Sequence, residues 1–201
     1  GGSSVGYQMV EFGQKVTMPS EPTKTGYTFA GWYTDGGLLT PFSFETPMGA
    51  ATMTLYAKWT TNSYPVSYNG NGQTGGTVPP EGSHDYNTSV TVQGNTGELF
   101  KTGYAFAGWN TAADGSGTPY AEAQTFTIGA GGVVLYAVWT VNSYTVSYDS
   151  NASDGGSAPS GMSGNYNTSI TLPGNVGNLE KIGHTFAGWN TAANGSGTAY
   201  A

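Results

Sequence analysis

The sequence predicts a mainly β protein built from tandem repeats, with little or no helix. A seven-residue sequence motif, here called the phrase, occurs three times, as GYTFAGW, GYAFAGW and GHTFAGW, at residues 26–32, 103–109 and 183–189. Aromatic residues, which favour pleated sheets, make up 13% of the chain, and turn-forming glycine occurs 33 times in 201 residues. No stretch shows sustained helical periodicity, so we expect at most one helical turn, near residues 120–124.

The repeat has a period of 80 residues. This interval separates Trp59 from Trp139 (139 − 59 = 80) and Trp109 from Trp189 (189 − 109 = 80). A period of this length suits a small domain with its own core better than a solenoid unit. We therefore predict a first module that lacks its first strand, a complete second module, and a third module that lacks its last strand, at residues 1–61, 62–141 and 142–201.

Four segments of the complete module are predicted as strands, because apolar alternation or a short apolar run is bounded by turn residues. In order, they are residues 64–68, 88–92, 104–109 and 133–139. Simple alternation in the third strand places Tyr104 and Phe106 on one face and Trp109 on the other. The last strand is apolar on both faces, which suits a central position in the sheet.

The connections between modules are short. Only residues 60–63 separate Trp59 from the next predicted strand at Tyr64. Because so short a connection leaves little slack, we expect the modules to be arranged end to end as a rod.

The phrase and its surroundings resemble the Listeria–Bacteroides repeat, also called the internalin B-repeat. Members of that family carry a Lys-Thr-Gly-Tyr-Thr-Phe-Ala-Gly-Trp segment followed by a terminal Leu-Tyr-Ala-x-Trp strand. The matching segments are residues 24–32 with 55–59, 101–109 with 135–139, and 181–189. The resemblance implies small β-grasp-like modules in tandem, an extracellular location on a microbial cell surface or in a secreted protein, and no catalytic residues.

The charge balance and the short apolar runs exclude two kinds of interaction. The net charge is −7, the sequence pI is about 4.4, and all five basic residues are lysines. Nucleic-acid binding needs clustered Lys and Arg, so we expect no nucleic-acid partner. The longest apolar run, residues 133–139, is too short to cross a bilayer, so we expect no membrane insertion.

No residue pattern indicates catalysis, a cofactor or a metal. The two histidines occupy different repeat positions, and His184 aligns with Tyr104 and Tyr27, so we interpret it as a residue at the edge of the core. The oxygen-rich segment 149–155 is the strongest candidate for calcium, but the aligned segment 69–75 has no carboxylate, so a turn is the better interpretation.

Three lysines recur at one repeat position: Lys24, Lys101 and Lys181. Internal isopeptide crosslinks would use such lysines, but no acid recurs with them. We therefore expect exposed lysines at strand edges, where they discourage edge pairing.

The tryptophans of the phrase allow two hypotheses. Trp32, Trp109 and Trp189 could form aromatic platforms that bind a glycan or a protein. Alternatively, each packs into its own module, which otherwise has few large apolar residues. Flanking glycines favour packing.

We therefore expect a non-catalytic extracellular repeat region that acts as a stalk or spacer and as a possible adhesion module. Its partners would be a surface protein or glycan of a host or a neighbouring cell. Head-to-tail self-association through donated strands is a further hypothesis, because both end modules are expected to lack a strand.

Overall fold

The computed structural model describes all 201 residues and contains thirteen β-strands and no helix. The expectation of a mainly β protein is thus confirmed. The chain divides into two compact units, residues 1–99 with 107–138 and residues 100–106 with 139–201. Each unit is described by itself below.

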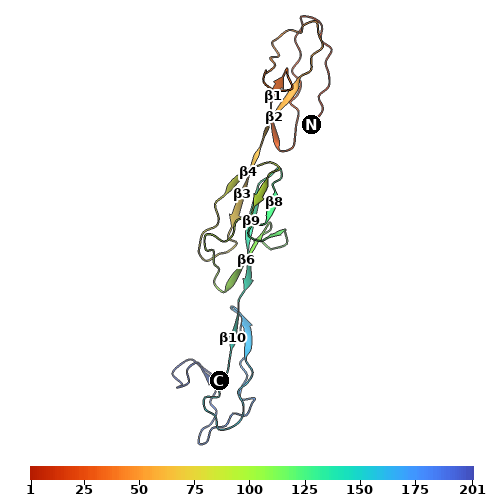
Figure 1. Cartoon of the computed structure of the whole chain (residues 1–201). Helices are drawn as coiled ribbons and strands as arrows, with labels where there is room; N and C mark the ends of the chain where they lie inside the picture. The colour runs from red at the N-terminus through yellow and green to blue at the C-terminus, as the bar shows by residue number, and fades with distance from the viewer. The chain divides into compact units, whose positions relative to one another are not determined.

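In the first unit, the first repeat is organised around one antiparallel pair of strands, β1 (Tyr27–Tyr33) and β2 (Tyr56–Thr61) (Figure 1). Phe29 lies opposite Trp59 and Trp32 lies opposite Ala57, so the register shifts within the phrase. Gly31 has a φ of 113°, a conformation that glycine adopts without strain.

The bulge corrects one expectation about the phrase. Simple alternation would place the tryptophan on the face opposite the preceding phenylalanine. Instead the rings of Phe29 and Trp32 lie edge to face, with centroids 5.3 Å apart, and those of Phe186 and Trp189 lie 5.2 Å apart. The extra residue in the bulge returns the tryptophan to the face of the phenylalanine, which alternation alone cannot reveal.

The second repeat contains a five-stranded sheet of order β4-β3-β9-β6-β7. In chain order, β3 is the first strand of this sheet and β9 is the last. Strand β3 runs parallel to β9 and antiparallel to β4. A separate antiparallel pair joins β5 to β8. The strands are β3 (Ser63–Asn69), β4 (Gly82–Asp85), β5 (Ser89–Thr91), β6 (Tyr104–Asn110), β7 (Pro119–Tyr120), β8 (Thr125–Thr127) and β9 (Val133–Val141).

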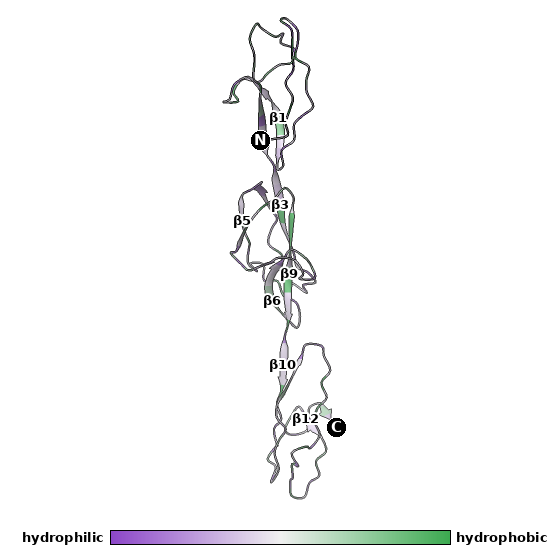
Figure 2. Cartoon of the chain, turned by 90° about the vertical axis from the view of Figure 1, so that its right-hand side faces the viewer, coloured by the Kyte–Doolittle hydropathy of each residue, from purple (hydrophilic) through white to green (hydrophobic).

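The core of the first unit lies in the second repeat. Leu135 and Ala137 of β9 are completely buried, and Trp109 of β6 is 1% exposed. Figure 2 shows the apolar stretch of β9 at the centre of this repeat. Other buried apolar side chains come from the remaining strands and loops: Val66, Tyr68, Val90, Val92, Leu99 and Ile128.

The second unit has shorter paired segments. Strand β10 (Ser143–Val146) pairs antiparallel with β11 (Met162–Asn165), and β12 (Trp189–Asn190) pairs with β13 (Ala199–Tyr200). Leu179 is the one apolar residue of this unit that is buried.

All four strands predicted in the second repeat are present, as β3, β5, β6 and β9. The sequence did not predict β4, whose residues Gly-Ser-His-Asp lack an apolar pattern, or the short strands β7 and β8. The expected helical turn near residues 120–124 is a non-helical turn with Ala123 at a φ of 63°.

The repeat boundaries at 61/62 and 141/142 stay predictions, as do the β-grasp-like and rod descriptions. The compact units group the residues differently, because β6 and β9 each continue from one unit into the other. None of the structure's elements is a helix with the length and hydropathy that crossing a bilayer requires.

Candidate functional site

Trp109 is held on both its polar and its apolar side by residues of its own repeat. Its indole N–H donates a hydrogen bond of 2.9 Å to the carbonyl of Gln93. Its ring packs edge to face on Tyr68, with centroids 4.8 Å apart, and the hydroxyl of Tyr68 accepts a hydrogen bond from the backbone N–H of Gln93. With 1% of its surface exposed, the Trp109 ring has no free face on which a sugar could stack.

Trp189 repeats this arrangement with more exposure. Its indole N–H donates to the carbonyl of Pro173 at 2.7 Å, and its ring lies 4.7 Å from that of Tyr148. Trp189 and Trp32 are both half-buried. Each of the three tryptophans therefore packs on an aromatic residue of its own repeat, and two of them keep part of their surface accessible.

A groove of about 920 Å³ adjoins Trp189 in the third repeat. Its apolar lining includes Tyr148, Ile170, Leu172 and Leu179. The counterparts of these side chains in the second repeat are buried, in the same core as Leu135 and Ala137 of β9. Aligned apolar residues are thus buried in the second repeat and line a groove in the third.

The histidines lie in different settings. His84 lies on β4 opposite Tyr64 of β3 and is half-buried. His184 is exposed, so its placement at the edge of the core is wrong. Its counterparts Tyr27 and Tyr104 are half-buried because each packs on a tyrosine of the following repeat, at 5.7 Å and 6.1 Å between ring centroids.

The oxygen-rich segment 149–155 forms a turn. The Asp149 carboxylate accepts the backbone N–H of Asn151 at 2.7 Å, and the Asn69 side chain accepts that of Asn71 in the same way at 2.8 Å. Since a neutral amide serves as well as the carboxylate, the turn does not depend on a negative charge. Nowhere does the structure gather three or more His, Cys, Asp or Glu residues that could hold a metal ion.

Two aspartates, the half-buried Asp35 and the exposed Asp114, have lowered pKa values. The backbone N–H groups of Thr40 and Leu39, which donate to the Asp35 carboxylate, lower its pKa. The hydroxyl and the backbone N–H of Ser116 lower the pKa of Asp114. Both carboxylates stabilise local turns by accepting hydrogen bonds, which favours the charged form.

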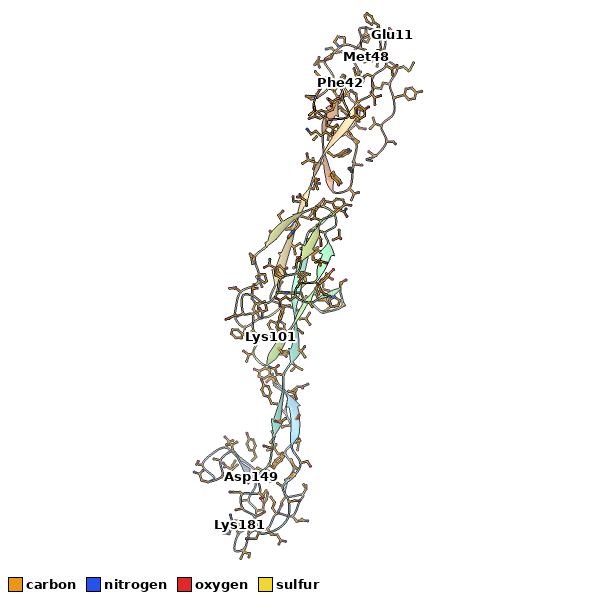
Figure 3. The ribbon with its side chains drawn as sticks, viewed as in Figure 1. Glu11, Phe42, Met48, Lys101, Asp149 and Lys181 are labelled. Atoms are coloured by element: carbon orange, nitrogen blue, oxygen red, sulfur yellow. The ribbon has the colours of Figure 1, made fainter.

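The recurring lysines lie at the turn that enters the phrase (Lys101 and Lys181 are labelled in Figure 3). The Nζ atom of Lys24 lies 3.8 Å from the ring centroid of Tyr27, and that of Lys101 lies 4.8 Å from that of Tyr104. Lys181 instead donates to the carbonyl of Asn151 at 3.1 Å. The prediction of exposed lysines is therefore wrong for Lys24 and Lys101, which are half-buried over their rings.

Tyr86 and Tyr166, the tyrosines that contact Tyr27 and Tyr104, are residues that the sequence reasoning missed. A signal for them exists, because Tyr-Asn-Thr-Ser occurs at residues 86–89 and again 80 positions later at 166–169. Their contacts join one repeat to the next.

Comparison with known proteins gives three matches along the chain. The model of the Listeria–Bacteroides repeat domain matches residues 1–58, 64–138 and 144–201. The matched family is a repeat family, and the match indicates no catalytic family. Among solved protein structures, none matches the chain.

Three curated relatives are similar over most of this chain. A provisionally named Gly-rich membrane protein of Evansella cellulosilytica is 42% identical over 83% of the chain, and a provisionally named membrane protein of the same organism is 40% identical over 73%. Internalin H of Listeria monocytogenes is 37% identical over 62% of the chain. The chain covers 19%, 22% and 21% of these proteins, or about a fifth of each.

Proposed function

Because the chain belongs to the Listeria–Bacteroides repeat family, we propose that it is a non-catalytic, extracellular repeat region of a microbial cell-surface protein and acts there as a spacer. Two relatives carry names of membrane proteins and one is an internalin, which supports a surface location. These relatives are about five times as long as the matched region, so other parts of such proteins would carry the binding or the anchor.

The observation that carries the spacer role is that two successive repeat junctions are built in the same way. At both, a tyrosine of the following repeat packs on the Lys-x-Gly-Tyr turn of the preceding one. A spacer needs a defined direction from each unit to the next, and a repeated side-chain contact provides it more firmly than a flexible linker does. Modules of residues 1–61, 62–141 and 142–201, arranged end to end, are therefore our preferred organisation.

Adhesion is the second candidate function. The half-buried Trp32 and Trp189 keep surface that a protein or a glycan on a host or neighbouring cell could contact. Burial of Trp109 weighs against a binding platform that uses the same residue in every repeat.

The spacer role is tested in the parent protein on intact cells. Removing residues 62–141 deletes one period and joins Thr61 to Asn142, the counterpart of Asn62. We expect an antibody against a distal part of the protein to label the cells less, because that part lies closer to the cell envelope. Substituting Trp32 and Trp189 with alanine is the matched control and should leave labelling and cell attachment unchanged. Attachment that is lost with the substitutions and kept with the deletion would contradict a spacer and support adhesion.

A further inference from the structure

The first junction between repeats is an aromatic side chain that covers a glycine. Gly26 follows Lys24 in a turn closed by a 3.0 Å hydrogen bond from the Tyr27 N–H to the Lys24 carbonyl. Gly26 is buried, and its φ of 79° favours glycine. A Cβ atom at this position would overlap the ring of Tyr86 from the second repeat. The glycine thus makes room for the tyrosine as well as for the turn.

The second junction repeats the first in detail. Gly103 has a φ of 79°, and a Cβ atom there would overlap the ring of Tyr166. The rings of Tyr104 and Tyr166 lie edge to face at 70°, as those of Tyr27 and Tyr86 do at 76°. The same contact therefore occurs at two places 80 residues apart.

A single asparagine fixes the backbone at each junction. The Asn62 N–H donates to the Gly26 carbonyl at 2.9 Å, and the Asn62 carbonyl accepts the Tyr86 N–H at 2.8 Å. Asn142 makes the same two bonds, with Gly103 and Tyr166, at the same lengths. Each asparagine is the only residue between two strands, so the connection is itself part of the contact.

The third copy of the turn presents the same geometry to solvent. Gly183 has a φ of 75°, and the His184 N–H donates to the Lys181 carbonyl at 2.9 Å. Gly183 and His184 are exposed, and a Cβ atom at Gly183 would meet no atom within 4 Å. The turn therefore adopts its shape without a partner, and the aromatic ring of His184 stands where Tyr27 and Tyr104 receive a tyrosine.

The matching aromatic residue of the first repeat is also exposed. Phe12 aligns with Tyr86 and Tyr166 and is 78% exposed. The residue after each of them has a positive φ, 78° at Gly13, 63° at Asn87 and 58° at Asn167, so the backbone that presents the ring is alike in all three repeats.

We propose that the turn of Lys181 to His184 is a docking site for the tyrosine or phenylalanine of a following repeat in the same polypeptide. The occupant has the position of Tyr86 in its own repeat and is followed by a residue in the left-handed region. This inference deepens the proposed spacer function and rests on it.

A covalently connected repeat fits this site, and a free second copy does not. One aromatic pair contributes less free energy than is lost when two free molecules are brought together. A one-residue connection places the ring beside the glycine at a high effective concentration and adds the two asparagine hydrogen bonds. Head-to-tail contact between separate chains through Phe12 is therefore not expected.

The direct test is a chain extended by one repeat. After Ala201, which lies 80 positions after Ala121, it continues with residues 122–141 and then with residues 62–141. Ring-current shifts are read by NMR at the α-protons of the three turn glycines. We expect upfield shifts at Gly26 and Gly103 in both chains, and at Gly183 only in the extended chain. Tyr→Ala at the added copy of Tyr86 should abolish the Gly183 shift alone.

A second measurement uses the present chain and needs no added repeat. Gly103→Ala and Gly183→Ala impose the same backbone strain, but only the first places a methyl group against a tyrosine ring. We expect Gly103→Ala to displace the Tyr166 ring, which changes the chemical shifts of its ring protons, and to lower the urea midpoint more than Gly183→Ala does. Equal effects of the two substitutions would overturn the proposal.

Two further outcomes are decisive. An unshifted Gly183 in an extended chain whose added Trp109 indole is protected from exchange would show that the folded fourth repeat does not dock. A Gly183 shift in the present chain that grows with concentration and disappears with Phe12→Ala would identify a second copy as the occupant. Either result overturns the proposal and leaves the cell-surface test of the spacer role intact.

Discussion

The second and third repeats have closely similar local structure and different cores. Trp109 and Trp189 donate to equivalent backbone carbonyls, and both rings pack on an equivalent tyrosine. Nevertheless Trp109 is buried and Trp189 is partly exposed. The second repeat includes β9, whereas residues 122–141 have no counterpart in the third repeat of this chain. Local hydrogen bonds thus set the shape of the phrase and its loops, and the last strand provides the burial.

The largest effect should come from removing the tryptophans one at a time. Trp109→Ala should lower the free energy of unfolding by about 3–5 kcal/mol, because it empties a buried site in the core. Trp189→Ala should lower the free energy of unfolding clearly less, since the Trp189 ring already contacts solvent. Urea unfolding followed by the amide NMR signals of each repeat separates the two. Equal losses would show that the burial difference does not determine stability.

Removing one side chain of β9 should make the second repeat resemble the third. Leu135 is completely buried, so Leu135→Ala should cost about 2–5 kcal/mol and increase the accessibility of Trp109 to a fluorescence quencher. Val134 on the same strand is 40% exposed and provides the control. If Val134→Ala destabilised the repeat as much as Leu135→Ala, β9 would not act through its buried face.

An asparagine in the loop before each phrase should have similar effects in both repeats. The Asn95 side chain accepts the Leu99 N–H at 2.7 Å and donates to the Leu99 carbonyl at 2.9 Å, and Asn175 does the same with Leu179. We expect alanine at either position to lower the free energy of unfolding by about 1–3 kcal/mol, because two partly buried backbone groups lose their partner. Amide hydrogen exchange at Leu99 and Leu179 measures this loss in each repeat. A loss confined to the second repeat would mean that this loop depends on β9.

The smallest difference concerns pH. Asp114 and Asn194 stabilise equivalent turns. The Asp114 side chain accepts a hydrogen bond from the Ser116 backbone N–H, and the Asn194 side chain accepts one from that of Ser196. The lowered pKa of Asp114 means that its contribution is present above the unfolded-state pKa, near 4, and is lost as the pH falls through the folded-state pKa. The Ser116 amide signal should therefore titrate below about pH 4. That of Ser196 should not, and Asp114→Asn should abolish the titration. A titrating Ser196 would assign the effect to another group.

Much of the fold could be predicted because the repeats present it three times. The period, the four main strands and the central place of β9 all follow from aligned apolar residues. The direction of the tryptophan could not be predicted, since one bulged glycine reverses the alternation on which the prediction depended.

The junction was missed for a different reason. Tyr86 and Gly26 are 60 positions apart (86 − 26 = 60), and no local pattern links a tyrosine after a turn to a glycine in the previous repeat. The alignment of His184 with Tyr27 therefore led to the interpretation that this position lies at the edge of the repeat's own core. The exposed His184 shows that the following repeat supplies the burial of Tyr27.

Small-angle X-ray scattering of the present chain tests most directly whether successive repeats are joined in a defined arrangement. The account predicts that a single arrangement of the repeats describes the scattering, and that Tyr86→Ala with Tyr166→Ala makes an ensemble of arrangements necessary while each repeat stays folded. Scattering of the unsubstituted chain that requires freely jointed repeats, or that is unchanged by both substitutions, would contradict the account.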